Sequence, residues 1–422
     1  MASSIAIQPV GWKDLTSPAP PPLPSVRSGH TLVVNRLTSE CFLFGGLDGL
    51  NCLNDLHVMT LQNDFSRAVW TEIDSERQDE NRPSPRASHC ACACGGEGMF
   101  VFGGVGETYA STLNDAYWFD FSTRKWSRLT NDAPATKIVR METEGHSTTS
   151  FPYGHGCVDS EVFFKPVAGS IEAGYGYACT YDATNDCVLM FGGTRGPNEF
   201  FNQLYVFHRA TESWWVLSSS STSTPSPRYL SKLALLDNDT KKLLVFGGGI
   251  PHSCLAGSPM EVFEFNLNTL QWSQVSTRGD QVPGSRFAFA FVELHIPGRF
   301  LIHGGLARAG VAGNQQGAAP IENARVFTDK VYHDDAWVFD YTSKTWSTVA
   351  ATERGEEEAR PGRLNFHAAV PLRGGKDVLF FGGFSAGVGR NNRTLRLRLE
   401  GYVPPLEHMC QALKPSILTP PT

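Results

Sequence analysis

The chain lacks any long apolar run and any marked excess of positive charge, and both absences exclude classes of protein. No stretch approaches the roughly 20 apolar residues that a membrane-spanning helix needs. The first residues, MASSIAIQPVGW, lack the charged start and apolar core of a signal peptide. The formal net charge is −6, which argues against nucleic acid or an anionic membrane surface as the main partner, because both attract clustered cations. No membrane insertion is expected, since no apolar run is long enough. We therefore expect a cytoplasmic or nuclear protein.

Residues that make turns are abundant by contrast. The 422 residues include 41 glycines and 26 prolines, a composition that favours short strands over long helices. The chain also has ten cysteines. In a reducing compartment we expect these to remain thiols, so they are interpreted as small apolar side chains or ligands and not as disulfides.

An apolar pair followed by Phe-Gly-Gly recurs along the chain, with a period of roughly 55 residues where no insertion intervenes. FLFGG (42–46) and FVFGG (100–104) are the first two copies, and LIHGG (301–305) carries His303 in place of the phenylalanine. Paired glycines suit a strand that ends in a tight turn beside a close neighbour. The six pairs are Gly45 and Gly46, Gly103 and Gly104, Gly192 and Gly193, Gly247 and Gly248, Gly304 and Gly305, and Gly382 and Gly383.

Two further positions repeat around each glycine pair. An alternating apolar run and then a tryptophan follow the pair, and an arginine precedes it, so each unit supplies four strands. The tryptophans are expected at the seams between sheets: Trp70, Trp126, Trp215, Trp272 and Trp346. The arginines open the first strand of five units: Arg27, Arg86, Arg228, Arg286 and Arg363. The third unit has GYGYACTYD (174–182) where an arginine is expected.

The sixth unit has no tryptophan strand of its own. GWKDL (11–15), near the start of the chain, matches WSRL (126–129) and supplies Trp12. We therefore predict that an N-terminal strand completes the last unit and closes the ring, which leaves no open sheet edge.

These spaced motifs resemble the kelch repeat, and the chain is identified on them as a member of the kelch-repeat β-propeller family. The resemblance implies an all-β fold with six blades over residues 11–403, between tails at 1–10 and 404–422. Two segments, 130–172 and 306–333, are insertions. The resemblance implies a protein-interaction scaffold or adaptor, with a protein partner of unknown identity. No enzymatic activity, catalytic residue, metal or cofactor is expected.

The insertions and the arginines should lie at one face of the propeller. In an up-and-down blade, the connection between the second and third strands emerges on the same face as the connection to the next blade. The family resemblance makes Arg27, Arg86, Arg228, Arg286 and Arg363 candidates for binding acidic partner peptides around the channel mouth. The alternative is that they pair with carboxylates or carbonyls of the propeller itself.

Two other functions remain open. Specifier proteins, which share this fold, hold iron through Glu, Asp and His at four-residue spacing. Asp329 and His333 have that spacing, although Arg325 stands at the Glu position. This leaves a metal-dependent propeller enzyme as one alternative. A substrate-recognition subunit of a ubiquitin ligase is the other, and it would need a separate recruiting subunit.

The stretch HCACACGG (89–96) allows two interpretations. Alignment on the arginines places Cys90 and Cys92 opposite Thr31 and Val33, positions where small residues dominate. Packing near the crowded axis therefore explains the cysteines. The alternative is a thiol pair lining the channel that binds zinc or is oxidised, because side chains two apart on a strand share a face.

Overall fold

The computed structural model describes residues 8–16, 23–62, 67–73, 81–107, 111–129, 164–166, 171–217, 219, 221–236, 240–249, 254–255, 257–278, 281–309, 330–349, 361–372 and 376–400. Within these ranges the only helix is a single 3-10 turn at Arg209–Thr211. No helix in the described ranges is long and apolar enough to cross a membrane.

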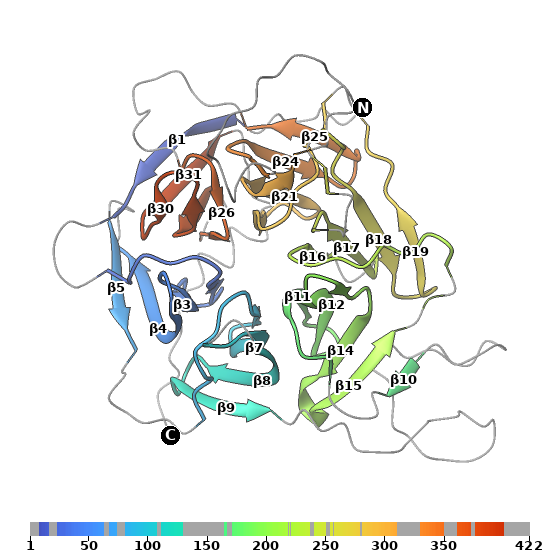
Figure 1. The fold of residues 1–422 in the computed structure, drawn as a ribbon, viewed down its shortest axis with the longest axis horizontal. Coiled ribbons are helices and arrows are strands. Elements are labelled where there is room, and N and C mark those ends of the chain that lie inside the picture. Colours follow the sequence, from blue (N-terminus) through green and yellow to red (C-terminus); the bar gives the residue numbers. More distant parts are fainter. Residues whose placement is uncertain are drawn as a thin grey trace, which may run out of the picture.

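Six antiparallel sheets surround a central axis, and the chain passes through them in order (Figure 1). Each sheet, or blade, has its innermost strand at the axis. Blades 1 and 2 comprise β2 (Thr31–Val34), β3 (Cys41–Leu47), β4 (Cys52–Leu61) and β5 (Ala68–Glu72), then β6 (Cys90–Cys94), β7 (Gly98–Val105), β8 (Thr112–Asp120) and β9 (Lys125–Leu129). Blade 3 comprises β11 (Tyr175–Asp182), β12 (Cys187–Gly196), β14 (Leu204–His208) and β15 (Ser213–Leu217), extended by β10 (Phe164–Pro166) and β13 (Glu199–Phe200).

The remaining blades follow the same order. Blade 4 comprises β16 (Lys232–Leu235), β17 (Lys242–Phe246), β18 (Val262–Asn266) and β19 (Gln271–Gln274), and blade 5 comprises β20 (Ala290–Glu293), β21 (Arg299–His303), β24 (Ala336–Asp340) and β25 (Thr345–Thr348). Blade 6 comprises β27 (Ala368–Pro371), β28 (Asp377–Phe381), β31 (Thr394–Glu400) and β1 (Gln8–Asp14). Short strands occupy the connections: β22 (Leu306–Arg308), β23 (Lys330–Tyr332), β26 (Leu364–Asn365), β29 (Phe384–Ser385) and β30 (Gly389–Arg390). The predicted all-β, six-bladed propeller is confirmed.

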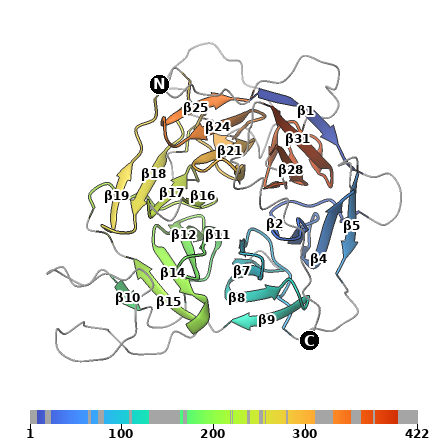
Figure 2. The same cartoon turned by 180° about the vertical axis from the view of Figure 1, so that it is seen from behind.

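The N-terminal strand closes the ring. β1 pairs antiparallel with β31, and Trp12 lies opposite Leu397. Figure 2 shows this from behind: the blue β1 lies against the red β31, so the start and the end of the propeller share one sheet. β1 begins at Gln8, slightly before the predicted start at residue 11. Closure satisfies the outer edge of β31, which would otherwise be an unpaired edge strand.

A tryptophan seals each seam by packing on the residue that precedes the Gly-Gly pair of the preceding blade. Trp126 lies 4.9 Å from Phe44 between ring centroids, and Trp70 lies 4.7 Å from Phe381. Trp12 packs in the same way on His303, at 5.5 Å. These aromatic contacts join neighbouring sheets through large apolar surfaces.

Blade 3 departs from the predicted register by one residue. Trp214 lies opposite Phe207, as Trp126 lies opposite Phe119, and Trp214 is the fully buried residue that packs 5.4 Å from Phe102. Trp215, which we had placed at this position, is only partly buried and lies opposite Val206. The two adjacent tryptophans point to opposite faces of the strand, so only one can reach the seam.

A second set of contacts joins the blades around the axis. One residue just before or at the start of each innermost strand has a positive φ: Gly29, Ser88, Gly176, Leu230, Ala288 and Phe366. Five backbone hydrogen bonds link these six residues from one blade to the next. Ser88, for example, donates its N–H to the Gly29 carbonyl at 2.7 Å. Four of these residues carry a side chain in a left-handed conformation that L-residues avoid. The interblade hydrogen bonds offset that conformational cost.

Candidate binding face of the propeller

The Gly-Gly pairs mark one end of the propeller, which we call the insertion face. Each second strand ends there, each third strand begins there, and the chain enters each innermost strand from there. Both predicted insertions belong to connections on this face. Most of segment 130–172 and most of segment 306–333 lie outside the described residues. The base of the second is described: β22 pairs with β23, with Leu306 opposite Tyr332.

Four of the five candidate arginines lie on this face but are buried. The Arg86 guanidinium donates to both oxygens of Asp115, at 2.8 and 3.0 Å, and to the Gly103 carbonyl at 3.1 Å. The Ser84 hydroxyl accepts a further hydrogen bond at 3.1 Å. Arg27 with Asp55, Arg228 with Glu261 and Arg286 with Asp335 repeat this arrangement, each also binding the carbonyl of the first glycine of the pair.

The arginine and its carboxylate are present or absent together. In blade 6 the equivalent position is Leu364, whose carbonyl accepts from Gly305 as that of Arg86 accepts from Gly46. The equivalent carboxylate position there is Arg393. In blade 3 the two positions hold Gly174 and Gln203. A buried guanidinium without its carboxylate would be an uncompensated charge, so the pair is replaced as a unit.

This arrangement corrects the predicted role of the arginines. Arg27, Arg86, Arg228 and Arg286 are fully buried and engaged inside their own blades, so their guanidinium groups do not face a partner. Arg363 differs because it stands one residue before the repeat position. Its side chain is 68% exposed and lies 3.7 Å from Asp334. Only Arg363 among the five is available to a partner.

The three aspartates of these pairs are held in their charged form. For Asp335, burial raises the pKa, but the hydrogen bonds and the charge of Arg286 outweigh it and lower the pKa to about 2. The pKa values of Asp55 and Asp115 are lowered against the same burial effect by Arg27 and Arg86. These ion pairs are therefore intact at neutral pH.

Exposed apolar side chains gather on the insertion face. Five large hydrophobic residues of the described chain are exposed: Val26, Leu37, Leu50, Val331 and Val388. Leu50 is 88% exposed in the loop after the first Gly-Gly pair, and Val388 is 81% exposed in the loop after the last. Leu37 lies at the opposite face, in the hairpin between β2 and β3. Sequence reasoning missed these residues, although a lone Leu in DGLN or a lone Val in AGVG is a detectable signal.

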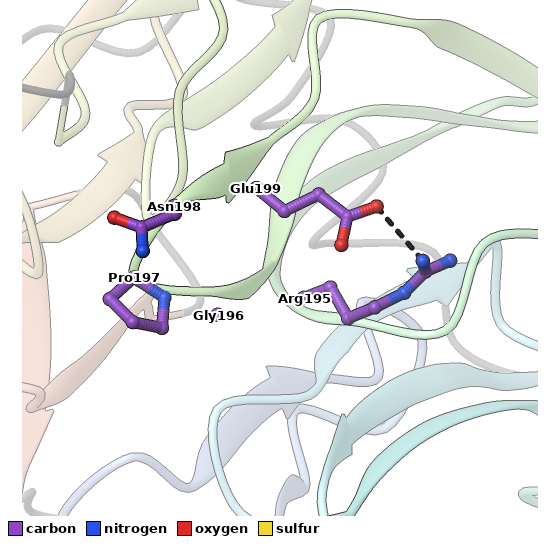
Figure 3. Close-up of a pocket in the computed structure, with 5 residues that line it drawn as sticks. All are labelled: Arg195, Gly196, Pro197, Asn198 and Glu199. Atoms are coloured by element: carbon purple, nitrogen blue, oxygen red, sulfur yellow. Dashed lines mark hydrogen bonds and ion pairs between the residues drawn. The ribbon is translucent and has the colours of Figure 1, made fainter.

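The same face carries a loop in blade 3 that contains ion-paired side chains. Figure 3 shows Arg195 and Glu199 pointing toward each other across the turn, with Pro197 at the tip. Their ion pair measures 2.9 Å, and Glu172 also contacts the Arg195 guanidinium. The loop borders an open hollow rather than an enclosed pocket. It offers a contact surface and no enclosed site for a small molecule.

The predicted iron site is only half described. Asp329 and Arg325 lie outside the described residues. His333 donates its backbone N–H to Gly305, and burial, followed by the charge of Arg286, lowers the pKa of its imidazole to about 4. Throughout the described ranges, no group of three or more His, Cys, Asp or Glu side chains is arranged to hold a metal ion. The cysteines of HCACACGG therefore do not form such a site with described neighbours.

Comparison with known proteins agrees with the repeat geometry. The model of the KLHDC2/KLHL20/DRC7 Kelch-repeats domain matches residues 7–164 and 157–383. Host cell factor 2 of Homo sapiens is 24% identical over 379 residues, which cover 86% of this chain and 40% of that protein. Acyl-CoA-binding domain-containing protein 4 of Arabidopsis thaliana is 24% identical over 89% of this chain and 45% of its own length. The chain thus spans less than half of these two relatives.

Two further similarities concern the fold and the question of catalysis. The solved structure titled "Structure of YjhT" superposes with a TM-score of 0.56 at 13% identity, over 90% of this chain and 98% of the other. N-(sulfonatooxy)prop-2-enimidothioate sulfolyase of Thlaspi arvense is 22% identical over 74% of both proteins. Our prediction that the chain is not an enzyme is therefore wrong as stated, since a relative that aligns over most of the propeller is named as an enzyme.

Kelch propellers generally mediate protein interactions, which agrees with the expected scaffold role at this coarse level. The evidence for membership is the family match across most of the chain, the six Gly-Gly turns and the closure of the ring by β1. The chain belongs to the family of KLHDC2/KLHL20/DRC7 kelch-repeat domains.

Proposed function

We propose that this chain is a protein-interaction scaffold that binds its partner through the insertion face. The observation that carries the proposal is the concentration of exposed apolar side chains there: Val26, Leu50, Val331 and Val388. Four of the five exposed large apolar side chains of the described residues belong to this one face, and exposed apolar surface on a soluble protein can mark an interaction site. The free thiols of the described chain are compatible with a cytoplasmic or nuclear location, which we include in the proposal.

The four side chains come from consecutive blades around the ring. Val331 lies on β23 of blade 5, Val388 lies between β29 and β30 of blade 6, and Val26 and Leu50 belong to blade 1. Figure 1 shows blades 5, 6 and 1 as neighbours, with β30 and β26 on the side toward β3. The exposed Arg363 belongs to the connection between blades 5 and 6. A partner with apolar anchors and a carboxylate would match this arrangement.

The test replaces two of these side chains by charge. The Leu50→Asp/Val388→Asp double variant should lose the proteins that the unaltered chain captures from an extract of its source, because a carboxylate cannot be buried against an apolar anchor. Leu37→Asp is the matched control, since Leu37 is 73% exposed on the opposite face. Each captured protein is then purified and its affinity measured directly. Binding that survives the double variant, or is lost equally in the control, rejects the insertion face.

A second candidate function is enzymatic. The similarity to the sulfolyase of Thlaspi arvense over 74% of both chains supports it. The substrate in that protein's name, N-(sulfonatooxy)prop-2-enimidothioate, is the probe to use, with and without added iron(II) because of the Asp329 and His333 spacing. Sulfate release measured by ion chromatography should then fall in a His333→Ala variant. Absence of sulfate release under both conditions would remove this candidate and leave the scaffold proposal unaffected.

A further inference from the structure

Four thiols gather along the seam between blades 2 and 3. Cys90, Cys92 and Cys94 share one face of β6 because residues two apart on a strand point the same way. That face packs into the apolar cluster between the two blades, and Cys179 on β11 packs against the same cluster from the other side. Strands β6 and β11 are the innermost strands of these two blades, and they contact each other.

The four thiols are close neighbours. Cys90, Cys92, Cys94 and Cys179 all pack in the same cluster between two contacting strands, and the Cys179 thiol interacts with those of Cys90 and Cys92. The Cys90 sulfur lies 3.7 Å from the Met190 sulfur. Cys90 and Cys94 are buried, whereas Cys92 and Cys179 are partly exposed. Two thiols from different blades are therefore both adjacent and accessible.

A lysine stands beside Cys179. Lys232, the first residue of β16, lines an axial cavity of about 80 Å³ to which all six blades contribute. No carboxylate among the described residues forms an ion pair with this ammonium group, while the Cys179 thiol lies close enough to interact with its charge. An ammonium next to a thiol favours the thiolate, which is the nucleophilic form.

The pKa values of the cysteine thiols are shifted in opposite directions. Hydrogen bonds from Cys90 and Cys92, supported by the charge of Lys232 against the effect of burial, lower the pKa of Cys179 to about 5. Burial raises the pKa values of Cys90, Cys41 and Cys254 instead. Among these thiols, Cys179 is therefore the one whose surroundings favour the thiolate.

We propose that Cys179 and Cys92 form a peroxide-sensitive dithiol across the seam between blades 2 and 3. In the first step the Cys179 thiolate attacks one oxygen of hydrogen peroxide, the O–O bond breaks, and a sulfenic acid and hydroxide result. In the second step the Cys92 sulfur attacks the sulfenic sulfur, the S–O bond breaks, and water leaves. In total, two thiols and one peroxide give one disulfide and two waters. The product ties β6 covalently to β11 at the channel wall.

The packing interpretation of HCACACGG does not require these properties. A position that needs only small volume is satisfied by Ala or Thr, as at Ala178 and Thr180 of the next blade. Volume alone does not explain why the thiols of two blades face each other, nor why an ammonium without a carboxylate lies beside one of them. The dithiol accounts for both observations.

The first measurement is the rate of alkylation of the intact chain by iodoacetamide, followed site by site by mass spectrometry. At pH 7 we expect Cys179 to react about ten times faster than the other thiols, because a larger fraction of it is thiolate. Lys232→Gln should slow the reaction and shift its pH profile upward, and Lys232→Arg should restore both. Cys187→Ser is the matched control, since Cys187 is buried in the same blade away from the seam.

The second measurement follows the disulfide. After treatment with hydrogen peroxide and blocking of free thiols, a non-reducing digest should contain the peptides of Cys92 and Cys179 joined, and dithiothreitol should separate them. A Cys92→Ala variant should instead hold Cys179 as a sulfenic acid that dimedone traps. A disulfide from Cys179 to Cys90 would overturn the assignment of Cys92, and an unreactive Cys179 in the folded control would overturn the proposal.

Discussion

The buried arginine–carboxylate pairs lead to a quantitative prediction, which we develop for Arg86 and Asp115. The change is Arg86→Leu, which installs the residue that blade 6 carries naturally as Leu364. It removes two hydrogen bonds to Asp115, one to the Gly103 carbonyl, one to the Ser84 carbonyl and one to the Ser84 hydroxyl. The Asp115 carboxylate, only 16% exposed, would then be an unpaired charge.

The expected loss follows from that geometry. Removing one partner of a buried ion pair costs about 3–5 kcal/mol. Since Asp115 keeps some contact with water, we expect the lower end, about 3 kcal/mol, in the free energy of unfolding. Replacing both partners, as Arg86→Leu/Asp115→Gln, should cost only about 1 kcal/mol, because no charge is left unpaired. The coupling energy between the two substitutions is then at least about 2 kcal/mol.

The assay is urea unfolding of the single and double variants, monitored by tryptophan fluorescence and analysed as a double-mutant cycle. Arg363→Leu is the control, because an exposed arginine should contribute less than about 0.5 kcal/mol. Additive effects of the two single changes would refute the reasoning, as would a loss in Arg363→Leu equal to that in Arg86→Leu. Either outcome would mean that the pairs are not the units that connect the Gly-Gly turns to the third strands.

Three further predictions concern pH, the turns and the seams. The pKa of Asp335 is lowered to about 2 in the folded chain, so its stabilising contribution is present above its ordinary pKa of 3.8 and is lost as the pH falls toward 2. Melting temperatures measured between pH 2 and 6 should therefore fall with falling pH. Asp335→Asn should reduce that dependence. Gly45→Ala should lower the free energy of unfolding by about 2 kcal/mol or more, because φ is +61° and the new Cβ would lie 2.8 Å from the Arg86 carbonyl oxygen. The control is Gly49→Ala, whose new Cβ meets nothing within 4 Å and which should be near neutral in urea unfolding. Trp214→Ala should cost about 3–5 kcal/mol and Trp215→Ala clearly less, and equal losses in the same assay would contradict the observed register.

Local patterns in the sequence determined the architecture. A glycine pair with positive φ, an alternating strand and a seam tryptophan each depend on a few neighbouring residues, so their recurrence predicted six blades. The absence of a tryptophan after β31 predicted that Trp12 would complete blade 6, and the contact between Trp12 and His303 agrees with it. The same contact places His303 at the position that phenylalanine holds in the other copies.

The register of individual strands and the burial of individual side chains could not be predicted from the repeat. Trp214 and Trp215 are adjacent, as are Arg363 and Leu364, and a one-residue choice decides which side chain faces the core. The repeated arginines are equally consistent with a binding ring and with internal pairs. Their carboxylates stand 28 to 49 residues further along the chain, at positions that the sequence pattern does not connect to them.

Contacts between blades were decided by tertiary structure alone. The sequence places Cys90, Cys92 and Cys94 on one strand face, but Cys179 and Lys232 belong to the next two repeats. Only the closing of the ring brings three innermost strands together at one axis, and only that closeness gives one thiol of the four a lowered pKa. The repeat determined which strands form, because strand formation depends on neighbouring residues; the ring determined which side chains meet, because those contacts join residues far apart in the chain.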